Sequence, residues 1–254
     1  MEASEPINSA SRLHSIFVRI DGIADNTPAL ALWRTVLEVK DDDDARCALT
    51  VARRLDWILK ELEAIRGAMA ARGSQFPEIL YDTSITRARN ACSVLLLTNT
   101  AQHVKQYVRP EDLKTFAFLA HVLPRDEARI DVSELLQLHE QVETLSEQLK
   151  TSELPDGLKA IVSHHLQLIR DALDQYPVRG AKALRQALHA AVGELAEAKT
   201  AVQEHRSAPE LSALRRLWSQ VHELSDIALR AQKIAQLGRA IWEEGNVLLL
   251  TYLT

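Results

Sequence analysis

Residues 131–150 read DVSELLQLHEQVETLSEQLK, and the apolar residues in this run recur at intervals of three and four. That spacing places one apolar stripe along an α-helix. The same alternation continues over Leu158–Tyr176 and Ala181–Val202, with Leu154–Gly157 and Gly180 lying between the runs. Because turns this short reverse the chain direction, the sequence predicts three antiparallel helices that share a core.

Proline and acidic residues mark the ends of these three helices. Asp131 and Glu134 form the pattern of an acidic capping box in front of the first. Pro155 is expected to start the second helix, and the pair Tyr176-Pro177 is expected to stop it.

The rest of the chain also has a helical pattern. Hydrophobic residues make up 46% of the 254 residues and aromatic residues only 5%, so the core must consist mainly of Leu, Ala, Ile and Val. One of the expected helices starts at Thr83, passes Leu95 and bends near residues 98–100. No segment has a clear strand pattern. The sequence predicts an all-α fold, an antiparallel helical bundle of about eight helices, with coiled-coil-like heptads in its C-terminal half.

The charged stretch Arg125–Arg129 is the best candidate for a boundary between domains. We expect an N-terminal helical half, residues 1–124, and a C-terminal helical bundle, residues 130–254. Packing of both halves as a single domain is the alternative.

Charge, apolar runs and cysteine spacing argue against a nucleic-acid-binding, secreted or membrane-spanning protein. The net charge is −5, with acidic and basic residues interspersed, which disfavours nucleic acid as a partner. No secretory signal pattern is visible, and the longest apolar runs are far short of the about 20 residues that cross a bilayer. Cys47 and Cys92 lack the spacing of a zinc or redox pair. These features favour a cytoplasmic protein.

Four consecutive carboxylates, Asp41–Asp44, raise the question of a cation loop. They lack the alternating ligand spacing and the closing glutamate that calcium loops need. We therefore expect the last of them to cap the following helix, and no metal or cofactor is predicted for the chain.

Arg216 and His222 form an Arg-x5-His spacing on a long expected helix. This spacing resembles the motif of HEPN ribonucleases, in which the arginine and histidine of paired helical subunits act together on the RNA backbone. The residue after the arginine is Leu217, where these motifs usually carry a small polar residue. The resemblance implies, as an alternative to a protein without catalytic residues, a helical ribonuclease that uses Arg216 and His222.

His164 and His165 are a second pair of candidates, because His165 falls on the apolar stripe of its helix. A histidine facing a helical core can be a metal ligand or a pH switch. No partner ligand is spaced for it, so a buried imidazole that is hydrogen-bonded to a neighbouring helix is the preferred interpretation. Two i to i+4 pairs, His139 with Glu143 and His222 with Asp226, suit a solvated helix face.

From Leu30-x-x-Trp33 to Gly193-x-Leu195 the sequence resembles a loose group of all-helical bacterial proteins that have no assigned activity. The residues carrying the resemblance are Ser152-x-Leu154-Pro155-x-x-Leu158, His165-Leu166-x-x-Ile169-Arg170 and Tyr176-x-x-x-Gly180-x-x-x-Leu184. These are packing and turn motifs. The resemblance implies a bacterial origin and supports the helix boundaries.

The function expected from the sequence is a non-enzymatic helical module for protein–protein interaction in a bacterial cytosolic system. Its partner would be another protein chain or a second copy of this chain. The apolar segment from Ile234 to Leu253 offers a further alternative, a peripheral membrane anchor, although Glu243 and Glu244 oppose binding to anionic lipid.

Overall fold

The computed structural model describes residues 6–41, 43–124, 127–197, 203–205 and 207–229. The chain divides into two compact units. One comprises residues 7–125, and the other comprises residues 1–6 together with 126–254. We call them the N-terminal unit and the C-terminal unit.

The predicted all-α class is confirmed. The described residues form ten α-helices, and the strands among them are β1 (Pro6–Ile7) and β2 (Glu127–Ala128), which pair in one two-stranded sheet. About eight helices were expected. One reason for the difference is that the helix expected from Thr83 is interrupted.

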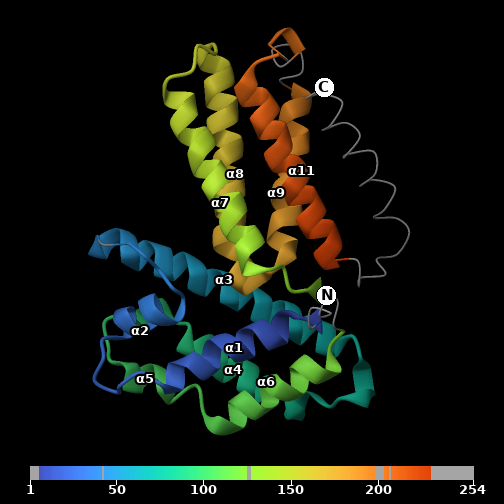
Figure 1. Cartoon of the computed structure of the whole chain (residues 1–254). Helices are drawn as coiled ribbons and strands as arrows, with labels where there is room; N and C mark the ends of the chain where they lie inside the picture. The colour runs from blue at the N-terminus through green and yellow to red at the C-terminus, as the bar shows by residue number, and fades with distance from the viewer. Residues whose placement is uncertain (1–5, 42, 125–126, 198–202, 206, 230–254) are drawn as a thin grey trace. The chain divides into compact units, whose positions relative to one another are not determined.

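The N-terminal unit contains six α-helices and three 3-10 turns. The α-helices are α1 (Ser9–Asp21), α2 (Ala29–Val36), α3 (Asp44–Ala70), α4 (Asp82–Ala91), α5 (Ala101–Lys105) and α6 (Pro110–Val122). The 3-10 turns are η1 (Gly73–Gln75), η2 (Glu78–Leu80) and η3 (Val94–Leu96). Helix α1 packs against α2, α3 and α6 (Figure 1). The rings of Phe17 and Phe116, 5.1 Å apart, join α1 to α6 in the core.

Asn8 fixes the start of α1 and also ties it to α6. Its side chain accepts from the amide of Ser11, and the Ser11 side chain accepts from the Asn8 amide, which completes a capping box. The side-chain nitrogen of Asn8 donates to the carbonyl oxygens of Ala120 and Leu123 at the end of α6. One buried side chain therefore satisfies backbone groups at two helix ends.

The described part of the C-terminal unit forms four long helices around one core. They are α7 (Val132–Lys150), α8 (Asp156–Arg179), α9 (Ala181–Glu197) and α11 (Pro209–Leu229). Helix α7 packs against α8, α8 against α9, α9 against α11, and α11 against α7. Consecutive helices run in opposite directions (Figure 1).

The apolar stripes of these helices are buried. Helix α7 contributes Leu138, Val142, Leu145 and Leu149, and α8, α9 and α11 contribute to the same cluster. Each buried leucine stabilises the fold by about 1.5–3 kcal/mol relative to an exposed one. The last two positions expected on the third stripe, Ala198 and Val202, lie outside the described residues.

Two helix ends differ from the prediction. Helix α8 does not stop at Tyr176-Pro177 but continues through Pro177 to Arg179. It ends at Gly180, whose φ of 65° and ψ of −157° suit glycine alone. Helix α4 ends at Ala91 and is followed by η3, so the prediction of one helix that continues past Leu95 was wrong.

β2 and the residues that follow it contact the junction between α8 and α9. The buried carboxylate of Glu127 accepts a hydrogen bond of 2.7 Å from the amide of Ala181, the first residue of α9. The amide of Ile130 donates to the hydroxyl of Tyr176 at 2.9 Å. The carboxylate thus satisfies an amide that a helix start leaves without an intrahelical partner.

Candidate functional site

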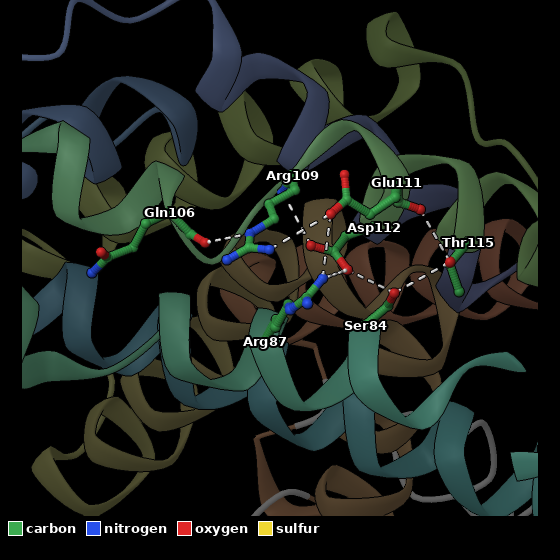
Figure 2. Close-up of polar contacts among 7 residues, drawn as sticks. All are labelled: Ser84, Arg87, Gln106, Arg109, Glu111, Asp112 and Thr115. Carbon is green, nitrogen blue, oxygen red and sulfur yellow. Dashed lines mark hydrogen bonds and ion pairs between the residues drawn. The ribbon is translucent and has the colours of Figure 1, made fainter. Parts of the chain in front are cut away.

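The N-terminal unit contains a cluster of polar side chains around Asp112, shown in Figure 2. Ser84 and Arg87 lie on α4, and Asp112 lies in the first turn of α6. Only 1% of Asp112 is exposed. We call these residues, with Arg109 and Glu111, the Asp112 cluster.

Both carboxylate oxygens of Asp112 have hydrogen-bond donors. Oδ1 accepts from the Ser84 hydroxyl at 2.7 Å and lies 3.3 Å from Arg87 Nη1, while Oδ2 accepts from the Arg109 amide at 3.1 Å. The amide contact caps α6, and the other two join α6 to α4. The cluster in Figure 2 contains no histidine, so Ser84 lacks the imidazole base that usually activates a serine nucleophile. This geometry favours a structural role.

A second buried polar cluster joins α1 to α3. The hydroxyl of Ser9 donates to Glu61 Oε2 at 2.5 Å, and Arg12 Nη2 donates to the same hydroxyl at 3.2 Å. All three side chains are buried. Because Ser9 both donates and accepts inside the core, this cluster also joins two helices, and its side chains are more than 90% buried.

His165 lies in the core of the C-terminal unit, with none of its surface exposed. Trp218 Nε1 on α11 donates to His165 Nδ1 at 3.1 Å. An indole nitrogen is only a donor, so Nδ1 must be the unprotonated nitrogen and the proton of the neutral ring lies on Nε2. Burial lowers the pKa of His165 to about 4. The ring is therefore neutral and its tautomer is fixed by Trp218.

The other ring nitrogen of His165 has no hydrogen-bond partner among the described residues. Glu194 Oε2 on α9 lies 3.8 Å from it, and the Glu194 carboxylate lies 2.9 Å from Nε2 of His164. Metal ligation through Nε2 would need the lone pair that the proton occupies. The geometry thus favours the buried imidazole over the metal ligand. No set of three or more His, Cys, Asp or Glu side chains within the described ranges is arranged to hold a metal ion.

Arg216 and His222 both lie on α11, but they contact different neighbours. Arg216 is exposed and lines a groove of about 200 Å³ with Gln141, Thr144 and Gln148 of α7. Six residues on an α-helix correspond to about 120° around its axis, which turns His222 away from Arg216. The pairing of subunits that the ribonuclease alternative requires stays a prediction.

His222 instead belongs to a polar group between α9 and α11. Burial lowers the pKa of His222, the Asp226 carboxylate opposes that shift, and the Arg185 guanidinium adds to it. Arg185 on α9 lies 3.8 Å from Asp226. Burial and the same Arg185 also lower the pKa of His189. The sequence drew attention to His222 and Asp226 but could not supply their partners from α9.

The other candidates that the sequence suggested are a run of aspartates, an apolar C-terminal segment and the pair His139 and Glu143. Asp43, rather than the expected Asp44, caps α3 by accepting from the Arg46 amide at 2.8 Å. Asp42 and the segment from Ile234 to Leu253 lie outside the described residues. His139 is exposed, and its neighbour Glu143 is bound by Arg170.

A groove in the described part of the C-terminal unit has a volume of about 710 Å³. Its walls are the turn between α7 and α8 and the start of α11. The lining residues are Gln148, Thr151, Ser152, Glu153, Leu154, Pro155, His205, Ala208, Pro209 and Glu210. Two of the described lining residues, Glu153 and Glu210, carry carboxylates.

An exposed apolar surface lies on the N-terminal unit, and sequence analysis missed it. The rings of Phe76 and Phe118 contact edge to face, with their centroids 6.0 Å apart. Ile79 and Leu80, in turn η2, are 84% and 51% exposed. We call Phe76, Ile79, Leu80 and Phe118 the η2 surface. The sequence of residues 74–82 is typical of a loop, and only the structure shows that Ile79 and Leu80 are exposed there while Tyr81 is buried.

Comparison with protein-family models, curated proteins and solved structures finds no match to this chain. In the part of the chain that the structure describes, no helix is both long enough and apolar enough to cross a bilayer.

Proposed function

We propose that this chain is a non-enzymatic helical module of a bacterial cytosolic system that binds another protein chain, either a different partner or a second copy of itself. The exposed η2 surface is the observation that carries the proposal. Apolar side chains left in water cost free energy, which burial against a partner recovers.

The chemistry of the η2 surface suits an interface. Binding energy in protein interfaces concentrates in a few aromatic and large aliphatic side chains near the centre of the contact. The rings of Phe76 and Phe118 contact each other, and Ile79, in turn η2, is the most exposed of the four side chains. Aromatic side chains have few rotatable bonds, so they lose little conformational entropy when a partner binds.

The surroundings of the η2 surface hold it in place. Asp82 begins α4 two residues after the end of turn η2, and its carboxylate lies 2.9 Å from Arg66 Nε on α3. The Asp112 cluster joins α4 to α6, which carries Phe118. The polar clusters described above thus support the proposal as parts of the scaffold that presents these apolar side chains.

A pair of surface variants tests the proposal. Ile79→Asp combined with Leu80→Asp should abolish self-association or the capture of a specific partner, measured by light scattering and by pull-down from the native host. Leu49→Asp is the matched control, because Leu49 is also exposed, at 71%, but lies on α3 away from turn η2. Circular dichroism should show both variants folded. A strictly monomeric wild-type protein that captures no partner would contradict the proposal.

The ribonuclease remains the competing proposal, with His222 as its most informative residue. Its support is the polar group that Arg185 and Asp226 form beside that histidine. The purified protein should then cleave RNA, and His222→Ala should stop cleavage without unfolding the chain. Intact RNA after incubation with the wild-type protein would exclude this alternative. Liposome flotation of the wild-type chain tests the membrane alternative.

A further inference from the structure

The contact between His165 and Trp218 depends on the protonation of the imidazole. Trp218 donates to Nδ1, so that nitrogen must keep its lone pair. An imidazolium carries a proton on each nitrogen. A second proton, taken from solvent onto Nδ1, would place two N–H donors against each other at the present distance of 3.1 Å. The hydrogen bond from Trp218 therefore cannot form when the His165 ring is positively charged.

A small movement of the ring would bring the second nitrogen of His165, Nε2, to a carboxylate that can accept a hydrogen bond. Nε2 of His165 lies 3.8 Å from Glu194 Oε2, beyond hydrogen-bond distance. A positively charged ring would be drawn towards that carboxylate and away from the indole. Protonation therefore removes the contact with Trp218 on α11 and favours a new contact with Glu194 on α9.

The titratable groups that act on this ring come from α8 and α9. Glu194 of α9 favours the imidazolium, and His164 of α8 itself disfavours it. Helix α11 presents the uncharged Trp218. Helix α7 contributes apolar residues such as Leu145 and Leu149 to the surrounding core. Burial outweighs the effect of Glu194, so the His165 ring is neutral while it is in contact with Trp218; we call this the closed arrangement.

We propose that His165 and Trp218 form an acid-sensitive latch that holds α8 against α11 and releases when the imidazole takes up a second proton. In the opened arrangement the ring reaches water and the Trp218 indole loses its acceptor. A proton is thus the ligand of this site, and its binding selects the opened arrangement.

Linkage gives the pH range in which the latch works. The pKa of His165 in the closed arrangement is about 4, and in water it returns towards its ordinary value of 6.5. The opened arrangement therefore binds more protons between these two values. Its population relative to the closed arrangement rises by up to about tenfold for each pH unit of acidification in that range.

The direct test follows the Trp218 indole proton in the wild-type full-length protein. Nuclear magnetic resonance of the indole N–H, assigned with Trp218→Phe, should show strong protection from solvent exchange at pH 7. Protection should fall progressively as the pH drops from 6.5 towards 4. An indole proton that stays equally protected down to pH 4 would overturn the proposal.

A matched pair of variants separates this latch from general acid denaturation. His165→Gln provides an amide oxygen that can accept from Trp218 but does not titrate, so its Trp218 protection should not depend on pH between 6.5 and 4. His164→Gln changes the neighbouring, half-exposed histidine and should follow the wild-type profile. If His165→Gln fails to fold, the wild-type titration still decides the question. A His164→Gln profile that lost the pH dependence would assign the effect to the wrong histidine and overturn the proposal.

Discussion

Arg170 on α8 donates to both carboxylate oxygens of Glu143 on α7. Nε lies 2.7 Å from Oε1, and Nη2 lies 3.1 Å from Oε2. This is the two-pronged geometry in which a guanidinium binds a carboxylate best. The contact lowers the pKa of Glu143, chiefly through the Arg170 hydrogen bond. Both side chains are partly exposed, so water screens the pair.

The first prediction concerns the pH dependence of this pair. Glu143 has a folded-state pKa below its ordinary value of 4.5. The pair therefore stabilises the fold fully above pH 4.5, and this contribution is lost as the pH falls through the lowered pKa. Arg170→Gln should cost up to about 1 kcal/mol at pH 7 and less at pH 3. Urea unfolding at both pH values measures the difference. Lys150→Gln, which removes an exposed ion pair with Glu147, should cost almost nothing at either pH.

The second prediction compares two leucines on one helix. Leu138 is fully buried in the core of the C-terminal unit, whereas Leu136 is 57% exposed. Leu138→Ala should lower the free energy of unfolding by about 2–5 kcal/mol, because it leaves a cavity in the core. Leu136→Ala should change it by less than about 0.5 kcal/mol. Equal effects in thermal or urea unfolding would show that α7 is not oriented as described. Leu145→Asp, which buries a charge, should unfold or aggregate the protein.

The third prediction compares the glycines at the two ends of α8. Gly180 has a φ of 65° and a ψ of −157°, which a residue with a Cβ adopts only under strain. Gly180→Ala should destabilise the protein by about 1–3 kcal/mol. Gly157 lies in the first turn of α8, and a Cβ there would meet no atom within 4 Å. Gly157→Ala should be neutral or stabilising, by up to about 1 kcal/mol. A Gly180→Ala protein as stable as the wild type would contradict the backbone geometry at this turn.

The fourth prediction concerns Asp112 and its neighbour. Asp112→Asn replaces one acceptor oxygen with a donor, so Ser84 or the Arg109 amide loses its partner. Such a loss in the core should cost about 1–3 kcal/mol. Glu111→Gln alters the adjacent carboxylate, which is mostly exposed, and should cost less than about 0.5 kcal/mol. Equal melting temperatures for the two variants would mean that the carboxylate of Asp112 is not part of the fold.

The spacing of apolar residues predicted the all-α class, because the side that a helix buries is set by the order of residues along that helix alone. Leu138, Val142 and Leu145 are buried where the spacing placed them. Helix ends were harder to predict. Pro177 lies in the last turn of α8, where it costs one hydrogen bond that the helix can lose without breaking, and Gly180 ends the helix instead.

Contacts between helices could not be predicted from one sequence. His165 was recognised as a core histidine, but its partner Trp218 is 53 residues away on another helix. Asp112 carried a detectable signal, since it follows Pro110 in the first turn of a helix, where a carboxylate caps. No comparable signal in the sequence marked the η2 surface, because the order of hydrophobic residues along the chain does not tell which of them remain in water.

Glu127 lies one residue beyond the point where the chain passes from the N-terminal to the C-terminal unit, and its carboxylate closes the first turn of α9. The connection between the units is therefore also a structural part of one of them. A residue near the start of this unit thus completes a helix that begins 54 positions downstream.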